Sequence, residues 1–150
     1  MNFKEKMKSN LMYHEVIELF EKQENKASRI AVLQKHADKN FVGFLCIALD
    51  PNVSFDVDIP EYRPSVDPAG LNILYLHNEV PRLYRFIKDH PRRAVGLSSE
   101  KQKSLLISLL EALHKDEADL LVRCIKKDLR VPFLTAKLVK EAFPGVEIGE

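Results

Sequence analysis

The sequence predicts an all-α protein, a compact bundle of about seven helices with a proline-rich extended insertion. Two observations lead to this prediction. Apolar residues recur every three or four positions over most of the chain, which is the period of one helix face. An apolar share of 45% over 150 residues is enough for one buried core. We therefore expect a single helical domain over residues 1–150, with flexible ends at residues 1–9 and 146–150.

Three amphipathic helices are predicted before residue 50. The first lies between Met12 and Gln23, where apolar residues share one face and glutamates occupy the other positions. Asn25 and Asn40 are suited to cap the second and third helices, because a short polar side chain accepts a hydrogen bond from a first-turn amide. Asp50-Pro51 ends the third helix, since the residue before a proline disfavours the helical conformation. The expected inward residues are Tyr13, Val16, Ile17, Phe20, Ala27, Ile30, Ala31, Leu33, Ala37, Phe41, Phe44, Leu45, Ala48 and Leu49.

Residues 51–78 are predicted to form an ordered loop stiffened by prolines. Apolar residues alternate with polar ones from Val53 to Ile59, as in an extended segment, yet no neighbouring segment has the pattern of a partner strand. A loop of this length in a compact domain either carries function or joins two halves, and both alternatives stay open. The residues expected to anchor its end in the core are Leu71, Ile73, Leu74, Tyr75 and Leu76.

Helical patterns return after the loop and are stronger there. Leucines form a wide stripe between Leu105 and Leu113, and a proline in the first turn, Pro81, is compatible with a helix start. The residues predicted to begin these helices are Asn78, Ser98 or Ser99, Asp116 and Thr135. The predicted stops are His90-Pro91 and Pro144-Gly145.

No complete catalytic apparatus is visible, so the protein is not expected to be an enzyme. The chain has no Gly-x-Ser-x-Gly motif, its five glycines are not clustered, and its five histidines are scattered. No local pair of His or Cys supplies two metal ligands, so neither a metal nor a cofactor is expected. Cys46 and Cys124 each lie in an apolar helical pattern and are read as reduced core residues. With no signal peptide and no long apolar run, we expect a cytoplasmic protein without a membrane partner.

Basic residues gather on the later helices, although the net charge is only +1. Residues 79–140 carry 14 basic and 8 acidic groups. Basic side chains near a helix end also favour the helix dipole, so a structural role is one explanation. The other is an anionic partner, with nucleic-acid phosphates the natural candidate. The candidate binding residues are Arg123, Lys126, Lys127, Arg130, Lys137 and Lys140, with Arg82, Arg85, Arg92 and Arg93 as a second patch.

Two C-terminal segments resemble a known DNA-binding module. The segments Leu120–Val131 and Val139–Gly145 are similar to the end of the N-terminal α-helical DNA-binding domain of ATP-dependent DNA ligases. The ligase adenylation motif Lys-x-Asp-Gly is not reproduced, because Leu129 follows Lys127-Asp128. Val131-Pro132-Phe133 stands where ligases commonly have a glycine after Leu-Arg. The resemblance therefore implies a DNA-binding module without ligation activity.

The whole chain is also similar to small uncharacterised proteins of tailed bacteriophages. The matching residues are Tyr62-Arg63-Pro64, Leu110–His114 and Leu138–Gly145. Together the resemblances imply a non-catalytic phage accessory protein that binds duplex DNA in the host cytoplasm. The alternative is a protein-interaction module, an inhibitor or adaptor of a host or phage protein, with Phe55 and Tyr62 of the loop as anchors. A minor virion component is a third alternative, and the oligomeric state stays open.

Overall fold

The computed structural model describes residues 11–92 and 98–148, and over these ranges the all-α prediction is confirmed. Seven α-helices and one 3₁₀ helix occur there, and no strand does. The helices are α2 (Tyr13–Glu21), α3 (Lys26–His36), α4 (Lys39–Leu49), α5 (Leu76–Glu79), η1 (Val80–Phe86), α6 (Ser99–Ala112), α7 (Lys115–Ile125) and α8 (Ala136–Ala142). Of the ends predicted to be flexible, residues 1–9 and 149–150 lie outside the described residues. Ile148, by contrast, is packed in the core with 6% of its surface exposed.

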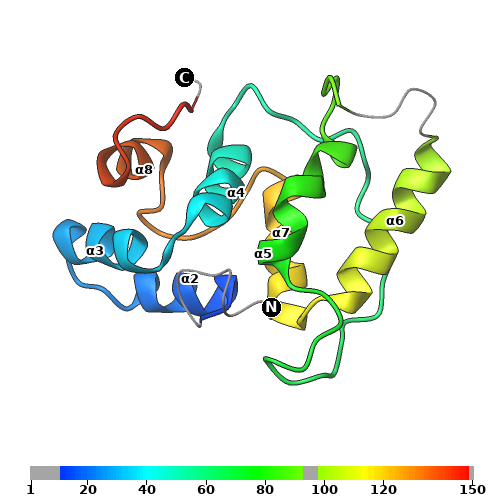
Figure 1. Ribbon diagram of the computed structural model, residues 1–150, viewed down its shortest axis with the longest axis horizontal. Helices are drawn as coiled ribbons and strands as arrows, with labels where there is room; N and C mark the ends of the chain where they lie inside the picture. Colours follow the sequence, from blue (N-terminus) through cyan, green and yellow to red (C-terminus); the bar gives the residue numbers. More distant parts are fainter. Residues whose placement is uncertain (1–10, 93–97, 149–150) are drawn as a thin grey trace.

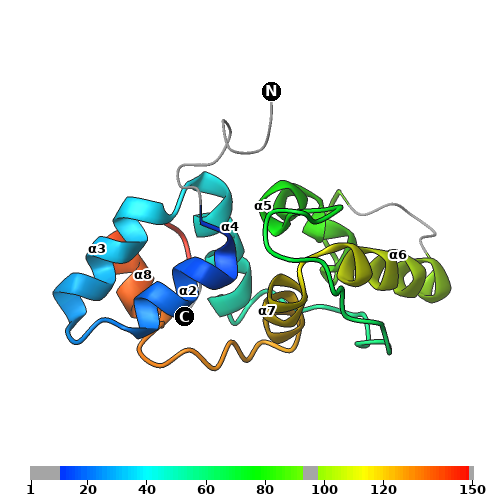
Figure 2. The ribbon, with the colours of Figure 1, turned by 90° about the horizontal axis from the view of Figure 1, so that it is seen from below.

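The helices form two groups that meet at α4 and α7. Figures 1 and 2 show α2, α3, α4 and α8 on one side and α5, η1, α6 and α7 on the other. The groups are joined because α4 packs against α5, η1 and α7, while α2 packs against α7. One buried cluster runs through both groups, so the molecule has a continuous core. Its largest fully buried side chains are Tyr13, Phe20, Phe41, Phe44, Phe86, Leu33, Leu45, Leu76, Leu83, Leu106, Leu110 and Leu113.

Three of the predicted helix caps are confirmed. The side chains of Asn25, Ser98 and Thr135 accept hydrogen bonds from first-turn amides of α3, α6 and α8, at 2.8, 3.2 and 3.2 Å. The prediction for α4 is wrong, because Asp38 rather than Asn40 is the cap and accepts from the Phe41 amide at 3.0 Å. These four caps show that a short polar residue before an apolar stripe is a sound local signal.

The other predicted helix boundaries are corrected by the structure. His114, not Asp116, precedes α7, and its Nδ1 accepts the Asp116 N–H at 3.0 Å. Asn78 lies inside α5, which begins at Leu76 and continues into the 3₁₀ helix η1. This helical region ends at Phe86, before His90-Pro91, because Ile87 turns into an extended conformation.

The extended part of the proline-rich loop has a partner after all. Phe55 forms an antiparallel bridge with Ile87, in which the Asp56 amide donates to the Phe86 carbonyl at 3.2 Å. The Lys88 amide donates in return to the Ser54 carbonyl at 2.8 Å. Sequence reasoning missed this pairing because the partner is a short segment that follows a 3₁₀ helix and has no strand pattern of its own.

Candidate functional site

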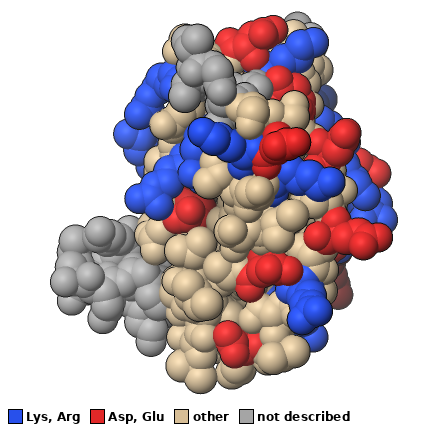
Figure 3. All heavy atoms as spheres, turned by 90° about the vertical axis from the view of Figure 1, so that its right-hand side faces the viewer, with Lys and Arg blue, Asp and Glu red and all other residues tan. Residues whose placement is uncertain are grey.

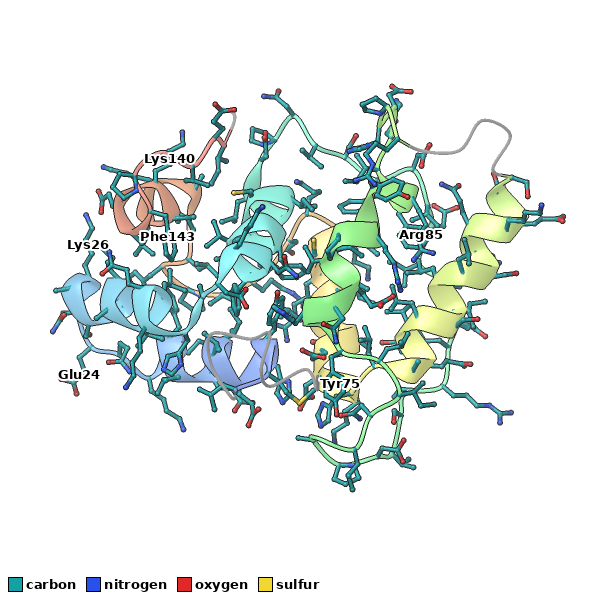
Figure 4. All side chains as sticks on the ribbon, viewed as in Figure 1. Glu24, Lys26, Tyr75, Arg85, Lys140 and Phe143 are labelled. Atoms are coloured by element: carbon teal, nitrogen blue, oxygen red, sulfur yellow. The ribbon has the colours of Figure 1, made fainter. Side chains whose placement is uncertain are left out.

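The two predicted basic patches lie on different elements, the first from the end of α7 to α8 and the second on η1 and the segment after it. Figure 4 shows Lys140 on α8 at one side and Arg85 between η1 and α6 at the other.

Two candidates of the first patch are engaged inside the protein. Lys127 Nζ donates to the carbonyls of Ile47 and Asp50 at 2.5 and 2.7 Å, so it satisfies carbonyls at the C-terminal end of α4. Burial lowers the pKa of this amine. Arg123 pairs with Asp119 at 2.7 Å and donates to the Leu129 carbonyl at 3.3 Å. Both side chains therefore hold the end of α7 and its connector in place.

Three other candidates, Lys126, Arg130 and Lys137, point into solvent. None of them has an ion pair within the described part of the chain. Phe133 lies between Arg130 and Lys137 in the chain, is 62% exposed, and carries the Arg29 guanidinium 3.8 Å from its ring centroid. We call these five residues the connector surface. Figure 2 shows the connection from α7 to α8 along the outside of the molecule.

The connection between α7 and α8 has an unusual backbone. Lys127, Arg130 and Phe133 have φ angles of 59°, 53° and 69°, in the left-handed region that non-glycine residues rarely occupy. Such residues cost on the order of 1 kcal/mol each and cluster at functional sites. At Lys127 the strain has a structural reason, because its amide and that of Asp128 donate to the Cys124 and Arg123 carbonyls and close α7.

The second basic patch is balanced by internal contacts and acidic neighbours. Arg82 pairs with the buried Glu79 at 3.3 Å, and Arg85 Nε donates to the Arg82 carbonyl at 3.0 Å. The Arg92 guanidinium lies 4.7 Å from the Tyr84 ring centroid, and Arg93 lies outside the described residues. Figure 3 shows acidic and basic side chains interspersed on the face that carries α6. Among the described residues of this patch, Arg82, Arg85 and Arg92 are therefore each engaged in a contact within the protein.

The loop between α4 and α5 exposes different residues from those predicted. Phe55 and Tyr62, the expected partner anchors, are half-buried and pack against the core. Leu71 and Ile73, expected in the core, are instead 72% and 79% exposed, and Val66 is 96% exposed. The apolar surface of this loop therefore lies at Val66, Leu71 and Ile73, which we call the loop patch.

The loop patch is held out from the helices by anchors on both sides. The Arg63 amide donates to Glu111 Oε2 at 2.7 Å, and the Leu74 amide donates to the Ala112 carbonyl at 3.0 Å. Tyr75 at the base of the loop donates through its hydroxyl to the Gly70 carbonyl at 2.8 Å (Figure 4). Residues 64–73 consequently project from the helices at the lower edge of the view in Figure 1.

Two histidines far apart in sequence meet where α2 packs on α7. The His14 and His114 rings are stacked with centroids 4.6 Å apart and an angle of 6° between their planes. Asp116 Oδ2 lies 3.9 Å from His14 Nε2 and 3.9 Å from His114 Nδ1. Burial, and then the neighbouring His114, lowers the pKa of His14, which favours its neutral form at neutral pH. Sequence reasoning missed this cluster because it sought ligands at short spacing.

A buried carboxylate lies next to this cluster. Glu117 is 1% exposed and accepts the amides of Tyr13 and Leu76 at 3.3 and 3.0 Å. It therefore caps the first turns of α2 and α5 from the first turn of α7. Burial raises the pKa of Glu117 to about 7, against the two hydrogen bonds that lower it.

The comparisons with known proteins give one match. Residues 16–131 match a family described as a family of unknown function, DUF6433. No curated protein matches the chain, and no solved structure does. Among the described residues, no helix combines the length and the apolar content needed to cross a bilayer. Since the match covers most of the chain, the protein belongs to the DUF6433 family.

Proposed function

We propose that this DUF6433 protein binds duplex DNA through the connector surface, mainly by contacts to phosphates. The observation that carries the proposal is the set of exposed cations and the exposed aromatic ring between the end of α7 and the first turn of α8, where the backbone is unusual. Lys126, Arg130 and Lys137 have no internal ion pair to break among the described residues, so they are available to replace the counterions of phosphates. Phe133 adds an apolar contact of the kind that proteins make in a DNA groove.

The ligase resemblance supports the same surface. Its two segments, 120–131 and 139–145, cover the end of α7, the start of the connector and most of α8. Because the glycine of the adenylation motif is replaced by Leu129, the proposal is binding without ligation. The protein is then a non-catalytic accessory factor of a tailed phage that acts in the host cytoplasm.

Fluorescence anisotropy with a labelled duplex tests the proposal. Three phosphate contacts predict a slope of log affinity against log salt of about −3, with little dependence on sequence. Replacing both Lys126→Glu and Arg130→Glu is expected to weaken binding to every duplex and to flatten the slope by about two.

The matched control changes Lys101→Glu and Lys103→Glu, two exposed residues of α6, which alters the net charge equally. This pair is expected to have a much smaller effect. No binding at low salt, or equal effects of the two pairs, would refute the connector surface as a DNA site. Tighter binding to a single strand of the same length would replace duplex with single-stranded DNA as the ligand.

A second candidate function is protein recognition by the loop patch. Val66, Leu71 and Ile73 expose large apolar side chains on one anchored loop, and a partner that covered them together would bury apolar surface. Phe55 and Tyr62 pack against the core, so they are not the residues that would contact a protein partner. In this second candidate function, Leu71 and Ile73 take that role.

Substitutions in the loop separate recognition from packing. Leu71→Ser with Ile73→Ser is expected to change the free energy of unfolding by no more than about 0.5 kcal/mol each, whereas Phe55→Ala should cost about 1–3 kcal/mol. Urea denaturation measures both. Capture of a protein partner from nuclease-treated infected cells should fail with the double serine variant if the loop patch binds it. Unchanged capture would remove this candidate.

A further inference from the structure

We propose that His14, His114 and Asp116 bind a divalent transition-metal ion, with zinc as the best fit, where α2 packs against the start of α7. The site is independent of the DNA-binding proposal, because none of its residues belongs to the connector surface. It joins one ligand from α2 to two from the opposite group of helices, so the bound ion would tie the two groups together.

The geometry is close to that of a metal site. One nitrogen of each ring and one oxygen of Asp116 lie within 4.8 Å of one another. An ion placed among three atoms spaced in this way is about 2.8 Å or less from each, whereas zinc bonds to nitrogen and oxygen are about 2.0–2.2 Å long. Binding therefore needs each ligand atom to move by less than about 1 Å. The two rings, which are stacked with an angle of 6° between their planes, must also rotate so that the lone pairs of both nitrogens point at the ion. Asp116 is able to make such a movement because its side chain is 48% exposed.

The donor set suits zinc better than a hard cation. Two imidazoles and one carboxylate are ligands that zinc accepts, whereas calcium and magnesium take oxygen ligands almost entirely. Three protein ligands leave a fourth position for water. That position is on the solvent side, since Asp116 is the exposed member of the set.

The surroundings of the two rings also favour a cation. A cavity of about 140 Å³ borders the cluster and is large enough for several waters. The acidic side chains that line it, besides Asp116, are Glu18, Glu21 and Asp119, with Arg123 as the one basic residue. Asp119 is paired with Arg123, so Glu18 and Glu21 are the other carboxylates whose negative charge would attract a cation to the cluster.

Metal binding has a local structural consequence at the start of α7. His114 Nδ1 accepts the Asp116 N–H, and this same nitrogen faces the Asp116 carboxylate. A nitrogen has one lone pair in the ring plane, so coordination through Nδ1 must release the Asp116 amide. The amide signal of Asp116 is therefore expected to shift on binding, together with the imidazole signals of both histidines.

Isothermal titration of the full chain with zinc chloride tests the site, after treatment with a chelator. One ion per chain is expected to bind with a Kd in the micromolar range or below, and to raise the melting temperature. His14→Ala and Asp116→Asn should each weaken binding by about tenfold or more. Cobalt chloride, as a second probe, should give visible absorption typical of a low-symmetry site with nitrogen ligands.

The matched control is His90→Ala, which removes a histidine that contacts Tyr84 rather than the proposed ligands and should leave binding unchanged. His114→Gln replaces the buried ligand by a side chain that still accepts the Asp116 amide, so the fold can be checked separately by circular dichroism. Equal binding by His90→Ala, His14→Ala and folded His114→Gln would mean that zinc binds only adventitiously, and would overturn the proposal. Absence of binding by the wild-type chain would do so directly.

Discussion

Replacing Glu117→Ala is expected to lower the free energy of unfolding by about 3 kcal/mol, one of the largest effects of any single substitution of a polar residue in this protein. The substitution leaves the amides of Tyr13 and Leu76 buried without an acceptor, at the first turns of two helices. A loss of this size corresponds to a fall of about 10 °C in melting temperature for a chain of this length. Thermal denaturation followed by circular dichroism measures it.

The same residue makes stability depend on pH. Burial raises the folded-state pKa of Glu117 to about 7 from an ordinary value of 4.5. Between these values the folded chain holds a proton that the unfolded chain has lost, so stability falls as the pH rises toward 7. Glu117→Gln cannot titrate, and its stability should change less between pH 5 and pH 7 than that of the wild type.

Urea midpoints measured at each pH unit from 5 to 8, with a chelator present, give the difference between the two proteins. The lowered pKa of His14 acts in the opposite direction, but it is common to both proteins and cancels in the comparison. Glu61→Gln, at an exposed position, is the control and should follow the wild type. Parallel curves for the wild type and Glu117→Gln would show that the buried carboxyl does not titrate in this range.

Glu117 illustrates which parts of the structure could be predicted from the sequence. Some helices have a clear apolar stripe and a polar cap, such as α3 after Asn25 and α6 after Ser98. These helices could be predicted because the interactions that form them join residues no more than four positions apart. Glu117 stands in a first helical turn, where an acidic side chain is ordinarily exposed and favours the helix dipole. It is buried only because the N-terminal ends of α2 and α5 meet it, and those ends are distant in sequence.

The candidate sites depended even more on distant contacts. His14 and His114 are 100 positions apart, so no spacing rule brings them together. The exposure of Leu71 and Ile73 likewise depends on anchors at Arg63 and Leu74, which act through α6. Composition did identify the basic connection between α7 and α8. It did not distinguish cations that face solvent from those, such as Lys127, that donate hydrogen bonds to the end of another helix.

Lys127→Met is expected to lower the free energy of unfolding by about 1–2 kcal/mol and to leave the salt dependence of DNA binding unchanged. The Lys127 ammonium donates hydrogen bonds to the carbonyls of Ile47 and Asp50, so its loss removes two charge-assisted hydrogen bonds at the end of α4. The net cost is expected to stay moderate because Ile47 and Asp50 are only partly buried, so we expect water to replace the lost donor when the side chain is removed. Urea denaturation and anisotropy with the labelled duplex provide the two measurements.

A second variant separates the side chain of Lys127 from its backbone. Lys127 has a φ of 59° at the position after α7 where glycine is most often found. Lys127→Gly removes the same two hydrogen bonds but relieves strain on the order of 1 kcal/mol, so it should destabilise the fold less than Lys127→Met. If Lys127→Met instead keeps full stability and flattens the salt slope by about one, the ammonium binds phosphate, and the connector surface extends to the end of α4.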